Sequence, residues 1–217
     1  MVGFMQALLG AYQYFLANQS RFWAATGEHL MLSLTALAIS VIVCAPLGIW
    51  IAHHATIAQY VITIFGTLRL IPSLAILFLV LPYLGLGFRP ALVGLTVLAC
   101  PPVLINTYAG VRNVDRAVVE AAYGMGMAPA QVLRRIEVPL ALPAIIAGVR
   151  IAAVEVIASA TLAAFIGGGG LGDFITRGFA LYDPRIMLVG AVPVALLALA
   201  SEVTLGGLQR LVSTPAV

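Results

Sequence analysis

Leu30 to Ala52 is an unbroken apolar segment that contains no charged residue. As an α-helix it is about 35 Å long, which exceeds the roughly 30 Å hydrocarbon core of a lipid bilayer. Hydrophobic residues make up 62% of the chain and charged residues 9%, whereas soluble domains carry about 25% charged residues. Because a helix satisfies its backbone hydrogen bonds internally in lipid, the sequence predicts an all-α integral membrane protein.

We expect five transmembrane helices, at Leu30 to Ala52, Ile57 to Leu84, Ala91 to Val111, Pro143 to Ile166 and Ile186 to Leu211. Two of them contain residues that interrupt a helix. Arg69 and Pro72 interrupt the second span, and Pro101-Pro102 should break the third near its middle. An arginine in lipid costs a few kcal/mol unless it faces protein or water, and prolines free backbone carbonyls that need a partner. Both interruptions are therefore predicted to line a pathway.

Val2 to Ala17 is apolar but shorter than the roughly 20 residues that cross a bilayer. It is expected to be an interfacial helix that lies along the membrane surface, within an N-terminal segment of residues 1–28. A sixth span is the alternative. The segment lacks the basic region of a signal peptide, so no cleavage is expected.

Residues 112–142 form an island of charge between two apolar spans and should lie in water. Asp115 can cap a short helix from Arg116 to Met125, which two glycines end. A second short helix can begin at Pro129, and Pro139 should stop it. Small residues at the bend allow close approach of backbones, so these helices suit a groove on another protein. A solvated loop is the alternative.

The glycine run from Gly167 to Gly172 opens a loop that extends to Arg185. It lacks the G-K-[ST] ending and the preceding strand of a phosphate-binding loop, so a flexible bend where the chain leaves the membrane is expected. His53 and His54 at the end of the first span are more often an interfacial feature than a metal site, and we assign them no function.

The charge balance and the cysteines exclude two further classes of site. The chain has 11 basic residues, all arginine, against 8 acidic ones, and the net charge of +3 is too small and scattered to indicate nucleic-acid binding. Cys44 and Cys100 lie in apolar runs without a Cys or His at ligand spacing, so they are interpreted as buried thiols and no metal site is expected.

A motif in the charged loop resembles a known family. Glu120-Ala121-Ala122, then Gly126, Ile136 and Val138-Pro139, follow the pattern EAA, G and I-x-L-P of the EAA loop in ABC importer permeases; only Val138 departs, where the family more often has leucine. The resemblance implies a type I ABC importer core of five transmembrane helices, whose coupling helix docks into a cleft on a cytoplasmic ATPase dimer. The residues assigned to this coupling are Glu120, Ala121, Ala122, Gly124, Gly126, Ile136 and Pro139. It also implies that this chain is not an enzyme, with no catalytic residue and no bound cofactor, while ATP and Mg bind the partner ATPase.

A finer resemblance covers nearly the whole chain after Glu28. The matching motifs are His29-Leu30 with Ser33-Leu34, Ile71 to Ala75, Asn106 to Gly110, Gly124 to Met127 and Ala160 to Gly167, and they are similar to permeases for glycine betaine, choline and related quaternary amines. Residues 29–217 are therefore interpreted as one permease transmembrane domain. The translocation pathway is assigned to Arg69, Pro72, Ser73, Pro101, Pro102, Asn106, Glu155 and Thr161.

The same resemblance implies the partners and the location. A second permease subunit, either the same chain or a paralogue, should complete the pathway in a bacterial cytoplasmic (inner) membrane. Because the chain ends at Val217 without a fused solute-binding domain, a separate extracytoplasmic binding protein is expected. Five spans place the two ends on opposite sides of the membrane, and a cytoplasmic basic loop puts the N-terminus outside and the C-terminus inside.

Glu155 is the residue least expected from this resemblance. Arg150 and Glu155 lie about 140° apart around a helix and form no simple i,i+4 pair. One interpretation makes Glu155 a packing partner for Arg150 or for Arg69 on a neighbouring helix. The other makes it a pathway carboxylate that attracts a quaternary ammonium as it passes.

Three other functions are weighed against this one. A type I permease for another small solute, such as an amino acid, would share the loop. A proton-coupled carrier would use Glu155 and the histidine pair as titrating groups, but it leaves the loop motif unexplained. A membrane scaffold without transport is disfavoured by the interrupted spans.

Overall fold

The computed structural model describes residues 2–213, with side chains from Met5 onward. All regular elements in this range are helices. In chain order they are α1 (Val2–Ala17), α2 (Gln19–Ala52), α3 (Ala55–Leu68), α4 (Ser73–Leu84), α5 (Phe88–Arg112), α6 (Arg116–Gly124), α7 (Pro129–Val132), the π-helix η1 (Leu133–Glu137), α8 (Val138–Ser159), the 3₁₀-helix η2 (Ala160–Ile166), α9 (Gly172–Ala180) and α10 (Pro184–Val212).

The spans agree with the prediction in number and in approximate position, except that α2 begins at Gln19 and not at the predicted Leu30, so residues 19–28 of the expected N-terminal segment belong to the first spanning helix. Helices α2 and α10, helix α5, and the continuous run Pro129–Ile166 are each long and apolar enough to cross a membrane. Helices α3 and α4 pass the same test only as a pair, which bends by 96° between Leu68 and Ser73. Counting this pair as one span gives the predicted five, with the interruption at the predicted place.

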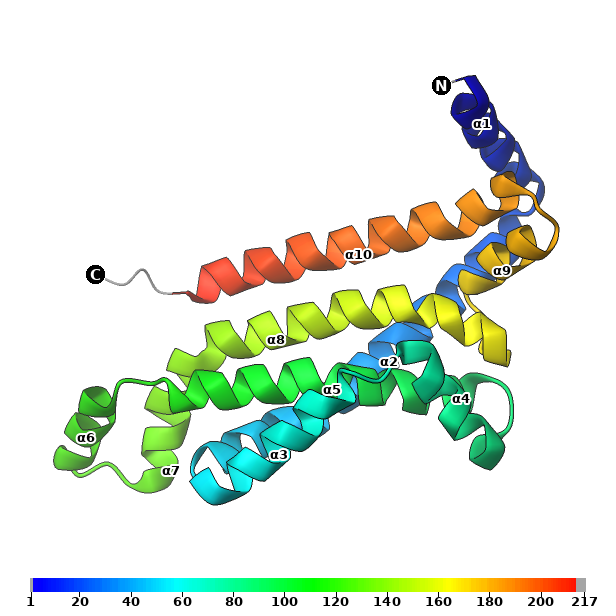
Figure 1. The fold of residues 1–217 in the computed structure, drawn as a ribbon. Helices are drawn as coiled ribbons and strands as arrows, with labels where there is room; N and C mark the ends of the chain where they lie inside the picture. Colours follow the sequence, from blue (N-terminus) through cyan, green and yellow to red (C-terminus); the bar gives the residue numbers. More distant parts are fainter. Residues whose placement is uncertain (1, 214–217) are drawn as a thin grey trace.

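Helix α5 lies between α2 and α8 and forms the centre of the bundle (Figure 1). Its Leu95, Val103 and Leu104 are fully buried, against Leu32 of α2 and Val156 of α8 among others. In lipid the hydrophobic effect adds little to helix association, so close packing of small residues carries more of the stability. Much of the core is accordingly alanine.

The predicted break at Pro101-Pro102 is wrong, because α5 continues through both prolines. The two prolines have no N–H to donate to the carbonyls of Val97 and Leu98, four residues earlier. Both of those residues line a cavity, and both prolines are buried against neighbouring helices. The helix is therefore continuous through both prolines, and the expectation that it faces protein is confirmed.

Pro139 does not stop the second short helix of the charged loop. The chain runs from α7 through η1 into α8 without interruption. A proline ring clashes with the carbonyl four residues earlier in an α-helix, here that of Arg135, and the wider π-turn immediately before Pro139 relieves this contact. The fourth span therefore begins well before the predicted Pro143.

The predicted loop after the glycine run contains the helix α9. Phe174 of this helix is buried and packs edge-on against Tyr14 at 6.5 Å between ring centroids. The guanidinium carbon of Arg21 lies 5.5 Å from the centre of the same ring. The loop itself is tied to α2, because Gly170 N–H donates to Glu28 Oε2 at 3.0 Å.

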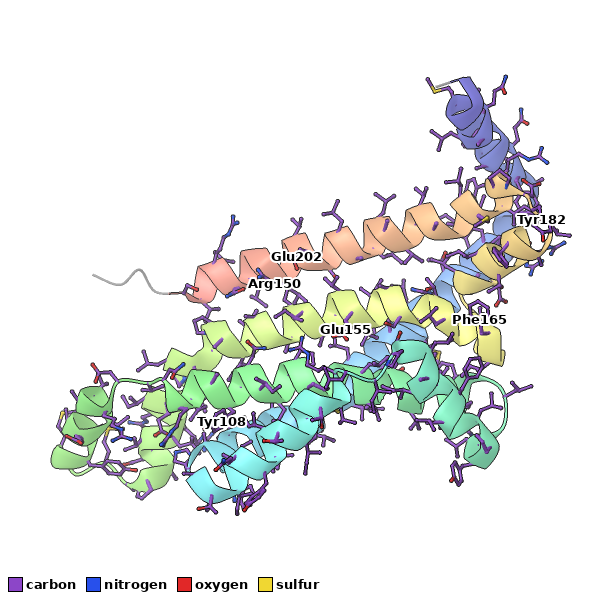
Figure 2. All side chains as sticks on the ribbon, viewed as in Figure 1. Tyr108, Arg150, Glu155, Phe165, Tyr182 and Glu202 are labelled. Atoms are coloured by element: carbon purple, nitrogen blue, oxygen red, sulfur yellow. The ribbon has the colours of Figure 1, made fainter. Side chains whose placement is uncertain are left out.

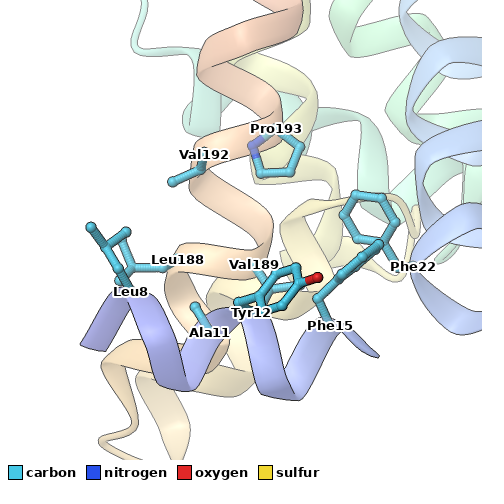
Figure 3. Close-up of a pocket in the computed structure, with 9 residues that line it drawn as sticks. All are labelled: Leu8, Ala11, Tyr12, Phe15, Phe22, Leu188, Val189, Val192 and Pro193. Atoms are coloured by element: carbon cyan, nitrogen blue, oxygen red, sulfur yellow. The ribbon is translucent and has the colours of Figure 1, made fainter. Parts of the chain in front are cut away.

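The predicted helix at Val2 to Ala17 is present with the same bounds as α1. It packs against α10 at one end of the bundle, whereas α6, α7 and the end of α10 lie at the opposite end (Figure 1). An apolar pocket of about 300 Å³ opens between α1, α2 and α10 (Figure 3); its lining residues are Leu8, Ala11, Tyr12, Phe15, Phe22, Leu188, Val189, Val192 and Pro193. The lining has no charged group, so this pocket is no candidate for a charged solute.

Candidate functional site

The charged loop forms a bend of two helices at one end of the bundle. Asp115 caps α6 as predicted, since its Oδ1 accepts a hydrogen bond from the N–H of Ala117 at 2.9 Å. At the other side of the bend, the N–H of Ala128 donates to Gln131 Oε1 at 2.9 Å and fixes the start of α7. Val132 of α7 is fully buried and anchors the bend to the rest of the protein.

The bend depends on Gly126, which has φ of +82°. This left-handed conformation is accessible to glycine without the steric cost that a Cβ imposes. Two hydrogen bonds close the turn: Gly126 N–H donates to the Tyr123 carbonyl at 2.9 Å, and Met127 N–H donates to the Ala122 carbonyl at 3.2 Å.

Most of the residues assigned to coupling are exposed, in this bend or next to it. Glu120, Ala121, Gly124, Gly126 and Pro139 are exposed, Ile136 is half-buried and Ala122 is buried. A Cβ added at Gly124 would meet nothing within 4 Å. Ala121, Gly124 and Gly126 are small and exposed, so a partner backbone can approach closely at these three positions. The large side chains of Tyr123 and Met125 are exposed beside them.

Sequence analysis missed a contact between His53 and Glu137. His53 Nε2 lies 2.9 Å from Glu137 Oε2, and Glu137 is 8% exposed. The contact joins the end of α2 to η1, at the point where the charged loop enters the bundle. Counting the spans places both residues on the same side of the membrane, because the first span ends and the fourth begins there, but only the packing of the helices brings them into contact.

A polar cavity of about 330 Å³ lies behind the bend. It is lined by the His53–Glu137 pair, by Arg112 at the end of α5 and by residues of α6; the remaining members are Ala52, Val111, Val114, Arg116, Val119, Glu120 and Tyr123. Three spans and the outer bend therefore meet at one place. Helix α6 packs against α7 and η1, and it shares this cavity with the ends of α2 and α5. A displacement of α6 would therefore change the cavity where these helix ends meet.

A second polar cavity, of about 220 Å³, lies at the interruption between α3 and α4. It brings together residues from three spans: Leu68, Arg69, Ile71, Pro72 and Ser73 from the interruption, Val97, Leu98 and Pro101 from α5, and Glu155 and Ser159 from α8. Five of the eight residues assigned to the pathway thus line one cavity: Arg69, Pro72, Ser73, Pro101 and Glu155.

The other three assigned residues lie elsewhere. Pro102 is buried next to α8, and Asn106 Nδ2 donates to the Pro102 carbonyl at 2.8 Å. Thr161 lies in η2, where its Oγ1 donates to the carbonyl of Ala158 at 2.7 Å. None of the three lines the cavity at the interruption.

Arg150 is not the partner of Glu155. Its Nε lies 3.5 Å from Glu202 Oε1, and Figure 2 shows Arg150 on α8 directed toward Glu202 on α10. The two side chains are part-exposed, so this pair adds little stability by itself. Of the two proposed partners, only Arg69 shares a cavity with Glu155.

The described residues contain no cluster of three His, Cys, Asp or Glu side chains with metal-binding geometry. Cys44 is buried and Cys100 is half-buried, and both are free thiols. His29 is fully buried, and its Nε2 lies 3.0 Å from the carbonyl of Ile157.

The sequence matches a family model described as "Binding-protein-dependent transport system inner membrane component" over residues 44–214. The chain is 42% identical over 204 residues to the carnitine transport permease protein OpuCB of Listeria monocytogenes, with 94% of each chain covered. It is 43% identical over 188 residues to the glycine betaine/carnitine/choline transport system permease protein OpuCB of Bacillus subtilis (strain 168), with 87% of each covered.

The fold is similar to that of a chain from the MetNI methionine ABC transporter in an inward-facing conformation. The TM-score is 0.82, with 90% of this chain and 98% of that chain covered. The sequence identity is 20%, so this likeness concerns the fold alone.

Proposed function

Because the chain belongs to the family of inner membrane components of binding-protein-dependent transport systems, we propose that it is the permease subunit of an ATP-driven importer for quaternary-amine osmoprotectants. Carnitine, choline and glycine betaine are the substrates proposed. One observation carries this proposal: identity of 42% or more to the carnitine permease and the glycine betaine/carnitine/choline permease extends over most of the chain in each case.

The outer bend of α6 and α7 is proposed as the contact with the ATPase. It is the exposed part of the charged loop, and its small residues let a partner approach the backbone. The cavity behind the bend places α6 next to the ends of three spans. Nucleotide-driven movement of an ATPase would thereby be transmitted to α2, α5 and α8, while ATP and Mg stay on the ATPase.

The remaining partners follow from the same assignment. A second permease subunit, the same chain or a paralogue, completes the pathway around the two-fold axis of an ATPase dimer, and a separate binding protein delivers the solute from outside. The basic residues of the loop favour a cytoplasmic position for the bend. The N-terminal helix α1, which lies at the opposite end of the bundle, would then be extracytoplasmic (Figure 1).

Copurification tests the assembly. The affinity-tagged chain is co-expressed with its candidate ATPase, extracted in mild detergent and purified. We expect the ATPase to elute with the chain in a complex whose ATP hydrolysis rises when loaded binding protein is added. A chain that purifies without an ATPase and transports solute on a proton gradient would instead support the carrier alternative.

The interruption between α3 and α4 is expected to be reachable by water. A cysteine is placed at Ser73, which lines the cavity, and another at Asn106, which packs on α8, in a variant that lacks Cys44 and Cys100. A water-soluble thiol reagent should modify position 73 in at least one nucleotide state and faster than position 106, because position 73 lines the polar cavity whereas position 106 packs on α8 outside it. Protection of position 73 in every state would mean that the cavity is not part of the pathway.

A further inference from the structure

The cavity between α3, α4, α5 and α8 contains one cation and one anion, Arg69 and Glu155. Its other polar side chains are the hydroxyls of Ser73 and Ser159. Its volume of about 220 Å³ is below the roughly 300–1,000 Å³ of pockets for drug-sized ligands. The cavity therefore has room for a small solute only.

The two charges do not satisfy each other directly. Among the described residues, Arg69 and Glu155 form no ion pair within 4.0 Å, with each other or with any third residue. The nearest basic residue on α8, Arg150, contacts Glu202 instead. Glu155 is half-buried and Arg69 is exposed in the single chain. Within a membrane-spanning segment such charges are costly unless they meet a partner or water, which makes them candidates for a functional site.

The interrupted hydrogen bonding of α5 adds a further polar element. The carbonyls of Val97 and Leu98 have no N–H partner at Pro101 and Pro102, and both residues line the cavity. Carbonyl oxygens without a donor favour a cation near them, as does the Glu155 carboxylate of the same cavity. The apolar parts of Val97, Leu98 and Pro101 can contact methyl groups.

We propose that Arg69 and Glu155 form a two-ended transit site for a zwitterionic quaternary amine. The guanidinium of Arg69 binds the carboxylate of the solute, for which its planar donor geometry is suited. Glu155 faces the trimethylammonium group, which has no N–H to donate and is recognised through its charge and its methyl surface. This site rests on the proposed function and specifies the solute class of the same pathway: carnitine and glycine betaine use both ends, whereas choline, which has no carboxylate, uses only the Glu155 end.

The test compares solutes in proteoliposomes that contain the complete importer with ATP and saturating binding protein. The variants are Arg69→Gln, Arg69→Lys and Glu155→Gln; Arg177→Gln, an exposed arginine on α9, is the matched control. Arg69→Gln should slow initial uptake of glycine betaine and carnitine about tenfold, the loss expected for one charge-assisted hydrogen bond, and change choline uptake less than about twofold. Arg69→Lys should restore part of the zwitterion uptake, and Glu155→Gln should slow all three solutes.

Other outcomes overturn the site. If Arg69→Gln slows uptake of choline and of the zwitterions equally and also lowers the melting temperature, Arg69 and Glu155 stabilise the structure and do not bind the solute. A wild-type importer that accepts only choline would leave the guanidinium without a ligand. If the wild-type importer transports the zwitterions but not choline, the comparison is between the two arginine variants. Equal slowing of zwitterion uptake by Arg69→Gln and Arg69→Lys would then contradict the site, because lysine keeps the positive charge that binds the carboxylate. A wild-type importer that transports none of the three solutes refutes the proposed function itself, which separates the two failures.

Discussion

Replacing Gly126 by leucine is expected to uncouple the permease from its ATPase. Gly126 has φ of +82°, where a Cβ costs about 1–2 kcal/mol, and it lies on the exposed outer face of the bend. Leucine would add both this strain and a side chain that keeps a partner backbone away. Copurification of the ATPase should be lost, and stimulated ATP hydrolysis and uptake should fall to background.

Two further variants separate the causes. Gly126→Asn keeps a residue that tolerates the left-handed conformation and should retain part of the coupling. Gly27 lies near the start of α2, far from the bend, and a Cβ there meets nothing within 4 Å. The Gly27→Leu variant adds the same bulk at this position and should retain normal coupling to the ATPase. Full ATPase stimulation by the Gly126→Leu variant would remove the bend from the coupling contact.

Replacing Gly148 by valine is expected to destabilise the bundle itself. A Cβ at Gly148 would lie 2.7 Å from the Pro102 carbonyl oxygen and 2.7 Å from Asn106 Cβ, so α8 would have to move away from α5. Overpacking of this kind costs about 3 kcal/mol, and here the obstacle includes backbone. The variant should melt at a markedly lower temperature in detergent and give less monodisperse protein in size-exclusion chromatography.

Gly66 provides the matched comparison. A Cβ at this position of α3 has nothing within 4 Å, so Gly66→Val should melt close to the wild-type temperature. If both variants melt like the wild type, the close contact between α5 and α8 does not limit the stability of the protein.

The elements that follow from apolar length were predictable from the sequence. A helix in lipid must satisfy its own backbone, so an apolar segment long enough to span becomes a helix, and α5 and α10 lie close to the expected ranges. Helix α2 ends where expected but begins at Gln19 instead of Leu30, and the shorter helix α1 has the expected bounds. The cap at Asp115 was predictable for a similar reason, because a local side chain satisfies a local N–H.

The wrong predictions of secondary structure concern positions where tertiary packing decides the local conformation, two of them at prolines. Proline breaks an isolated helix, but α5 packs between α2 and α8 and remains helical through Pro101 and Pro102. At Pro139 the chain uses one π-turn to avoid the clash, which no local propensity indicates. The helix α9 was missed because its formation depends on burial of Phe174 against Tyr14, a residue far away in the sequence.

The two cavities could be predicted only in part. The interruption at Arg69 and Pro72 and the carboxylate at Glu155 were visible as unusual residues in apolar spans, and a common cavity encloses them. The His53–Glu137 contact joins residues that are 84 positions apart, and neither residue is unusual at its own place in the sequence. Such pairs become visible only when the packing of the spans is known.

Uptake in proteoliposomes distinguishes an ATP-driven importer from a proton-coupled carrier. The purified permease, its ATPase and its binding protein are reconstituted with ATP on the ATPase side, and labelled carnitine, choline and glycine betaine are added on the other. If the chain is the permease of an ATP-driven importer, we expect uptake that requires ATP and the binding protein and is unaffected by a proton uncoupler. Uptake that continues without ATP and collapses with the uncoupler would contradict it.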